Sequence, residues 1–135
     1  MGPTYAEVEV GTELPSQTFT VQRLNLVMYC GASGDFNIIH WNERIATAVG
    51  LPNVIAHGMF TMALAARYVE EWVGGRGQVL TVGTKFTKPV PVPSEGADVE
   101  ISGVCEDQGD GRIVTLTVTC NGEQVLGRFK ATLRA

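Results

Sequence analysis

The feature that most limits the fold of this chain is the alternation of apolar and polar residues in its second half. Four segments alternate with period two or are rich in β-branched residues: 79–87, 97–105, 112–120 and 124–133. Such alternation predicts strands with one buried face. In the last segment a small, apolar face opposes a largely basic one: Val125, Gly127, Phe129, Ala131 and Leu133 against Arg128, Lys130, Thr132 and Arg134.

Turn residues separate these expected strands. The connection 89–96 begins with a proline and ends with a glycine, and 107–111 contains two glycines. Asn121 and Gly122 form a dipeptide typical of two-residue type I′ hairpin turns. Three sequential hairpins predict an antiparallel sheet.

One segment is apolar enough to cover such a sheet. Residues 59–73 carry the longest helical pattern, and a run of glycines ends it. Its first half is apolar on nearly every side, which predicts a buried helix. Ala63, Ala65 and Ala66 would let the sheet approach closely. The predicted fold is α+β, with one long central helix wrapped by a curved antiparallel sheet, in a single domain covering residues 1–135.

Shorter elements are expected before that helix. A helix over 21–32, capped by Thr20, would place three apolar side chains on its buried side: Leu24, Val27 and Met28. A short helix over 43–49 would have Asn42 as its N-cap and Gly50 as its stop. Two extended pieces and a turn should come first: 5–10, 17–21 and, between them, 11–16.

Composition excludes several classes of function. The net charge of −4 and the pI near 5.1 argue against nucleic acid as a partner, since phosphate binding needs concentrated Lys and Arg. No apolar run is long enough for membrane insertion, and the first residues lack the pattern of a secretory signal. The three cysteines share no metal-ligand spacing. They are interpreted as reduced packing residues, so a cytoplasmic location is expected.

The loop between the two expected N-terminal helices carries the candidate chemistry. Asp35 and His40 place a carboxylate and an imidazole five residues apart. The expected helix start at His57 and Gly58 would add free backbone N–H groups and a positive dipole end. Dehydration of a β-hydroxyacyl compound needs such an acid–base pair and donors for the enolate oxygen. The residues alone also allow, and on balance favour, a structural Asx turn at Asp35 beside a buried histidine.

The stretch 29–42 resembles the hydratase motif of the MaoC-like, R-specific enoyl-thioester hydratases and dehydratases, a branch of the hot-dog fold. The likeness includes the dehydratases of type II fatty-acid synthesis. It extends to 56–59 and 85–90, so it covers essentially the whole chain. One position departs from the pattern, since Ile38 stands where the family usually has proline. The matching residues are Tyr29, Ser33, Gly34, Asp35, Asn37, Ile39 and His40.

The resemblance implies roles for four residues. Asp35 and His40 would be a catalytic dyad that holds the water added or released and moves its protons in a syn process. The Gly58 N–H would bind the thioester oxygen, and Asn37 would orient the loop. His57 is interpreted as a residue of the helix start, with a third catalytic role as the alternative. No metal and no redox cofactor are expected.

The implied activity is that of a (3R)-hydroxyacyl-thioester dehydratase, reversible as a trans-2-enoyl-thioester hydratase, acting on acyl-CoA or on acyl carrier protein (ACP). The implied assembly is a homodimer, or a heterodimer with a related hot-dog subunit. The alternatives are a β-oxidation type of R-specific hydratase, a non-catalytic acyl-binding subunit, and a thioesterase on the same fold. The basic residues Lys85, Lys88, Arg128 and Lys130 are read as a solvated strand face, or as contacts for a phosphopantetheine phosphate or an acidic carrier.

Overall fold

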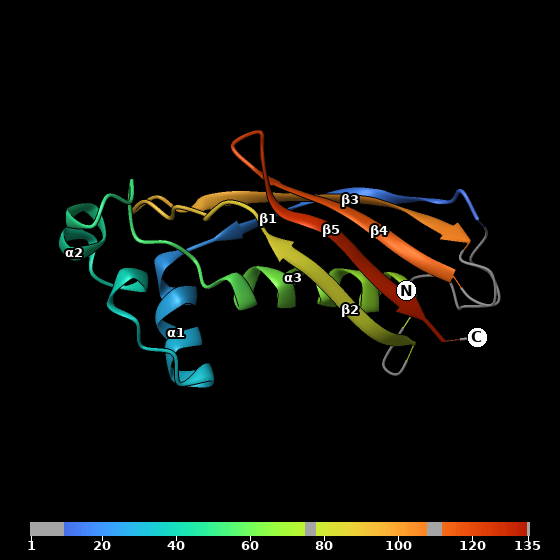
Figure 1. The fold of residues 1–135 in the computed structure, drawn as a ribbon, viewed down its shortest axis with the longest axis horizontal. Helices are drawn as coiled ribbons and strands as arrows, with labels where there is room; N and C mark the ends of the chain where they lie inside the picture. Colours follow the sequence, from blue (N-terminus) through green and yellow to red (C-terminus); the bar gives the residue numbers. More distant parts are fainter. Residues whose placement is uncertain (1–9, 75–77, 108–111, 135) are drawn as a thin grey trace.

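A five-stranded antiparallel sheet dominates the computed structural model, which describes residues 10–74, 78–107 and 112–134. The strands lie in the order β1-β3-β4-β5-β2, so β1 and β2 form the two edges. Helix α3 runs along one face of the sheet, and α1 and α2 lie together near one end of it (Figure 1). The α+β prediction, with a long helix against a curved antiparallel sheet, is confirmed. The strands are β1 (Glu13–Val21), β2 (Val79–Phe86), β3 (Ala97–Asp107), β4 (Arg112–Cys120) and β5 (Glu123–Leu133).

The hairpin between β4 and β5 forms as predicted. Asn121 and Gly122 both have positive φ values, 53° and 77°, as a type I′ turn requires. Along β5 the predicted apolar face is buried, and Phe129 is completely excluded from solvent. The basic side chains Arg128 and Lys130 are exposed on the other face.

The predicted hairpin between β2 and β3 is wrong. β2 pairs with β5, whereas β3 pairs with β1 and β4. The connection instead crosses to the segment that precedes α3, where Ala56 N–H donates to the Val90 carbonyl (2.9 Å) and Val92 N–H to the Val54 carbonyl (2.8 Å). Turn residues mark where a strand ends, but they do not say which strand will lie beside it.

Helix α3 (Gly58–Trp72) forms within one residue of the predicted bounds. Its buried residues, Thr61, Ala65, Tyr68 and Val69, share one face at helical spacing. The opposite face is open in this chain, since Met59 is 56% exposed. The expectation of burial all round is therefore wrong for the single chain.

The packing of α3 predicts a difference between neighbouring alanines. Ala65 is fully buried, whereas Ala63 is exposed. Ala65→Leu should overpack the core and lower the free energy of unfolding by about 1–3 kcal/mol. Ala63→Leu is the matched control and should leave the melting temperature nearly unchanged. Equal melting temperatures for wild type and Ala65→Leu would contradict this packing.

Helix α1 (Arg23–Ser33) forms, but its cap and its buried face differ from the prediction. Gln22 is the N-cap and forms a capping box with Asn25, while Thr20 belongs to β1. The buried residues are Leu26 and Cys30. The three side chains expected to be buried are exposed: Leu24 by 63%, Val27 by 54% and Met28 by 63%. Apolar residues occur on both sides of this helix, so periodicity did not decide between the faces.

Two smaller corrections concern the N-terminal part. Strand β1 begins at Glu13, inside the predicted turn 11–16, and buries Leu14. A register irregularity between Leu14 and Gln17 accommodates Pro15 and Ser16 within the strand. The short helix α2 (Glu43–Ala48) follows the prediction, with the Asn42 side chain accepting from the Ile45 N–H. The expected strand 5–10 and the turn 107–111 fall almost wholly outside the described residues.

Within the described ranges, the helices are too short or too polar to cross a lipid bilayer. All three cysteines are buried, as expected for packing residues.

Candidate functional site

Helix α1 ends in the loop that carries Asp35. Gly34 has a φ of 77° and closes the helix, with its N–H donating to the Cys30 carbonyl at 2.9 Å. One carboxylate oxygen of Asp35 then accepts from the Asn37 N–H at 3.1 Å, which is an Asx turn. The side chain remains exposed, so this turn leaves the second carboxylate oxygen accessible. The Asx turn that the sequence allowed is thus present, and it does not prevent Asp35 from exchanging protons.

Asn37 organises the next turn of the loop. Its side-chain oxygen accepts from the Ile39 N–H at 3.3 Å and caps the 3₁₀ turn η2 (Ile38–His40). The Ile38 carbonyl accepts from the N–H groups of Trp41 (3.2 Å) and Asn42 (2.9 Å). The loop is therefore fixed by hydrogen bonds even though Ile38 replaces the usual proline.

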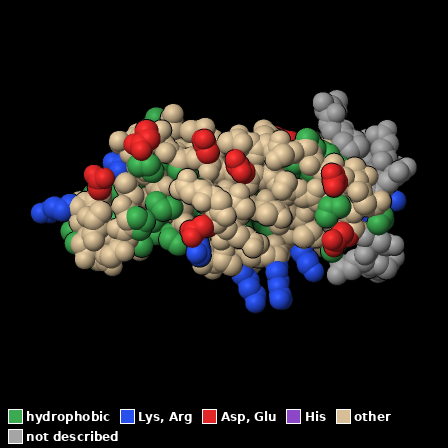
Figure 2. Space-filling model, turned by 90° about the horizontal axis from the view of Figure 1, so that it is seen from above, with side chains coloured by type: hydrophobic (Ala, Val, Ile, Leu, Met, Phe, Trp, Pro, Cys, Tyr) green, Lys and Arg blue, Asp and Glu red, His purple; other side chains and the backbone are tan. Residues whose placement is uncertain are grey.

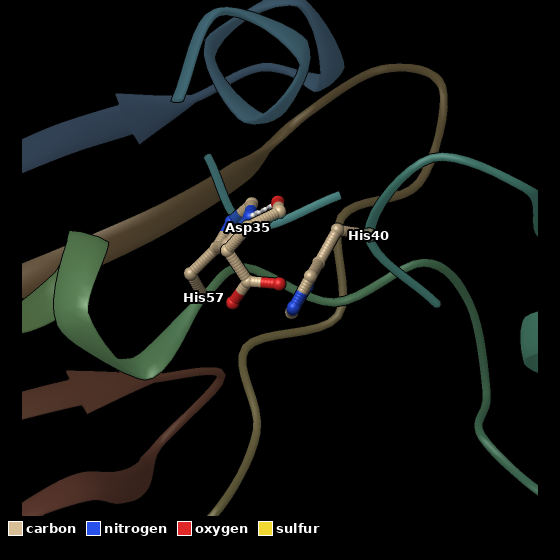
Figure 3. A group of neighbouring side chains, drawn as sticks. All are labelled: Asp35, His40 and His57. Carbon is tan, nitrogen blue, oxygen red and sulfur yellow. Dashed lines mark hydrogen bonds between the residues drawn. The ribbon is translucent and has the colours of Figure 1, made fainter. Parts of the chain in front are cut away.

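His40 is buried, and a short hydrogen bond helps to set the orientation of its ring. Its Nδ1–H donates to the Ile55 carbonyl at 2.6 Å. A carbonyl only accepts, so the hydrogen sits on Nδ1 and the Nε2 lone pair is free. The Asp35 carboxylate points toward this tip of the His40 ring (Figure 3). The carboxylate and the imidazole thus lie close together, and the tautomer of a neutral His40 is defined.

His57 lies directly beside this pair. It is the N-cap of α3, and its Nε2 is 3.1 Å from the backbone carbonyl oxygen of Asp35. Its ring stacks on the His40 ring, with centroids 3.6 Å apart and planes inclined by 17°. Burial lowers the pKa of His57 below 6.5, and His40 lowers it further, while the hydrogen bond to Asp35 acts in the opposite direction.

Asp35, His40 and His57 each offer a ligand atom within 4.8 Å of the others. No metal is expected from the sequence, yet the fold brings three candidate ligand atoms together. A metal binds in the plane of an imidazole, at about 2.0–2.1 Å from the nitrogen. Two rings stacked at 3.6 Å and 17° cannot both direct their lone pairs at one ion. The donor geometry therefore does not fit a metal centre.

A cavity of about 370 Å³ opens beside His40 and the first residue of α3, Gly58. Its lining is mostly apolar, with Phe86 and Leu126 contributed by the sheet. A Cβ on Gly58 would lie 3.0 Å from the Phe86 ring. The lack of a side chain at Gly58 therefore leaves room in the cavity between the start of α3 and Phe86. The first N–H groups of a helix lack partners within the helix, which leaves the Gly58 N–H available to a ligand.

The fold thus brings together all four residues singled out in the sequence, Asp35, Asn37, His40 and Gly58. Sequence reasoning missed the Ile55 carbonyl, which has no signature because any residue could supply it. It also treated His57 mainly as part of the helix start. Its contact with His40 becomes visible only in the fold, where the two rings stack.

Comparisons with known proteins agree with this geometry. Residues 6–124 match the family described as MaoC like domain. The chain is 33% identical over 114 residues to 3-hydroxyacyl-thioester dehydratase Z of Mycobacterium tuberculosis, covering 78% of this chain and 74% of that protein. It is 31% identical over 97 residues to 3-hydroxyacyl-thioester dehydratase X of the same organism. That match covers 72% of this chain but only 31% of the longer relative.

Solved structures show the same relationship. A MaoC-like dehydratase superposes with a TM-score of 0.92 at 37% identity, covering 98% of this chain and 42% of the other. The R-hydratase PhaJ1 of Pseudomonas aeruginosa gives a TM-score of 0.85 at 26% identity, covering 99% and 86%. The family match spans well over half of the sequence and includes the loop of Asp35 and His40. The chain therefore belongs to the MaoC-like family of hot-dog proteins.

Proposed function

We propose that the chain is a (3R)-hydroxyacyl-thioester dehydratase, reversible as a trans-2-enoyl-thioester hydratase. The observation that carries the proposal is the Asp35 carboxylate facing the free Nε2 of His40 beside the cavity that Gly58 lines. The relatives named as hydroxyacyl-thioester dehydratases and R-hydratase support this reaction and its stereochemistry. We propose that the chain is a single hot-dog domain and that this domain carries the dyad.

In the proposed mechanism the dyad holds one water molecule. During hydration, one of Asp35 and His40 takes a proton from this water while its oxygen bonds to C3 of the enoyl thioester. The dyad then delivers this proton to C2 on the same face, through whichever of the two groups faces C2, and dehydration reverses both transfers. The Gly58 N–H stabilises the negative charge that develops on the thioester oxygen. Asn37 keeps the loop in position through its bond to Ile39.

We propose that the substrate is carried on CoA or on ACP. Lysine and arginine side chains project from one long edge of the face shown in Figure 2. Exposed basic residues of β2 and β5 include Lys85, Arg128 and Lys130. Positive side chains on an otherwise acidic protein suit a phosphopantetheine phosphate or an acidic carrier. We propose that the reaction uses no metal and no cofactor, that nucleic acid is not a partner, and that the protein works in the cytoplasm.

We further propose that the chain works as a pair, with itself or with a related hot-dog subunit. The stripe Leu24, Val27 and Met28 on α1 and the open face of α3 would otherwise leave large apolar side chains in water. Another solved structure with the same fold is the ChsH1–ChsH2 complex of Mycobacterium tuberculosis, which contains two different chains.

The proposal is tested by adding trans-2-enoyl-CoA to the purified protein, alone and with candidate partner subunits. Hydration removes the absorbance of the conjugated thioester without releasing free thiol. Thiol release would instead indicate a thioesterase. Unchanged substrate under all conditions would favour a non-catalytic acyl-binding subunit and contradict the proposal.

The proposed oxyanion donor can be removed while the helix is kept. Gly58 is the first residue of α3, where proline is well tolerated, and the preceding His57 has φ −61° and ψ 136°, which suit a residue before proline. Gly58→Pro lacks the N–H and should lower kcat by about 10²–10³-fold. Gly58→Ala keeps the N–H while adding the same Cβ near Phe86, so it isolates the donor. Equal kcat values for the two variants would exclude the Gly58 N–H from the reaction.

A further inference from the structure

His57 has no role in the proposed proton transfers, yet it contacts both members of the dyad. Its side chain is only 2% exposed. One face of its ring stacks on His40, and its Nε2 reaches the backbone carbonyl of Asp35 at 3.1 Å. His57 thus contacts the ring of His40 and the main chain of Asp35 at the same time.

These contacts fix the tautomer of His57. The Asp35 carbonyl can only accept, so the hydrogen of a neutral His57 sits on Nε2. The Cys30 Sγ lies 3.6 Å from the same nitrogen. Nδ1 is therefore bare, and it is buried without a hydrogen-bond partner within the described residues. His40 carries its hydrogen on the other nitrogen, Nδ1, facing Ile55.

The surroundings also oppose a positive charge on His57. A second proton would lie on Nδ1, where no acceptor is present in the described part of the chain, and it would be buried. The titratable groups that face the ring are the side chains of Asp35, His40, Cys30 and Tyr29, the last through an edge contact at 4.7 Å. Burial is the largest influence, and it lowers the pKa of His57, with the opposing bond to the Asp35 carbonyl second. The charge of His40 also lowers this pKa, and that of the Asp35 carboxylate raises it, both by smaller amounts.

We propose that His57 is a positioning residue, held as the neutral Nε2–H tautomer, which fixes the Asp35 main chain and the plane of the His40 ring. The inference rests on the proposed function, because it assigns His57 to the same dyad. Of the two stacked imidazoles, only His40 exchanges protons with substrate. The His57 ring stays uncharged, so it does not compete with His40 for the proton.

The first test needs no activity, because the chain contains only two histidines. Long-range ¹H–¹⁵N spectra of the wild-type protein should show two imidazoles, assigned by the signals lost in His57→Gln. The His57 ring should carry a single hydrogen, on Nε2, at pH 7, and its pKa should lie below the ordinary histidine value of about 6.5. A His57 pKa at or above that value, or a hydrogen on Nδ1 of the neutral ring, would overturn the inference while leaving the proposed reaction untouched.

The second test separates positioning from mere structure. His57→Phe keeps an aromatic ring against His40 but loses the donor to Asp35, so kcat should fall by about 100-fold with little change in KM. His57→Gln places an amide N–H at a similar reach and should recover most of that loss. Cys30→Ala removes the other neighbour of Nε2 and should leave kcat unchanged.

Wild-type kcat in His57→Phe, or equal losses in the Phe and Gln variants, would refute the positioning role. If His57→Phe does not fold, the comparison of His57→Gln with wild type and the spectra of the wild-type protein decide the question. Absence of hydration in the wild type, with the expected His57 spectrum, would count against the proposed function alone.

Discussion

Asp35→Asn is expected to lower kcat for enoyl-thioester hydration by about 10³-fold, within the range typical of a lost general acid or base. The amide oxygen can still accept from the Asn37 N–H, so the Asx turn should persist. What the amide cannot do is take up and return a proton beside the His40 Nε2. The rate is measured by the loss of the conjugated thioester absorbance, with KM determined separately.

The matched control is Asp98→Asn, the same substitution at an exposed carboxylate of β3 that accepts from the Thr20 hydroxyl. An amide can accept that bond as well, so neither rate nor stability should change. If Asp35→Asn stays within about tenfold of wild type, Asp35 is not a general acid or base, since such groups contribute at least about 10²-fold.

The second large effect concerns stability. Phe129 is completely buried on β5, opposite Leu116 of β4. Phe129→Ala should lower the free energy of unfolding by about 3–5 kcal/mol, because it removes a buried ring and leaves a cavity. Domains of this kind have a total stability of about 5–15 kcal/mol, so the variant should be close to unfolding at moderate temperature.

Urea denaturation of both proteins measures the difference, provided that the slope m is unchanged. Phe36→Ala is the matched control, because Phe36 is 63% exposed in the chain. Its stability should lie within about 0.5 kcal/mol of wild type. Similar losses in the two variants would mean that Phe129 is not part of the core as described.

The second half of the fold was predictable because its signal is local. Alternation along one strand reports the two faces of that strand, and β4 has the bounds expected from the sequence, Arg112–Cys120. Pairing is not local. Nothing in 79–87 indicates that β2 lies against β5, so the connection 89–96 was mistaken for a hairpin. The buried face of α1 was misjudged for a related reason, since Leu24 and Leu26 are equally apolar and only packing distinguishes them.

The candidate site shows the same division. Asp35, His40 and Gly58 were identified because their residue types and their family motif carry information. The ring orientation of His40 depends on the Ile55 carbonyl, and that of His57 on the position of Asp35. Both are main-chain contacts between segments that are separate in the sequence. The sequence therefore indicated which residues form the candidate site, whereas the structure supplied the tautomers of the two histidines and the stacking of their rings.

The pairing of β1 with β3 has a consequence for biosynthesis. Thr18 lies opposite Glu100, so the first strand finds its neighbour only after most of the chain has been made. Topologies dominated by such distant pairings fold slowly, because the ends of long loops must meet first. During translation, α3 and the dyad loop leave the ribosome before any strand that covers or neighbours them is complete, apart from β1. The buried face of α3 must therefore remain uncovered until β2, β4 and β5 follow.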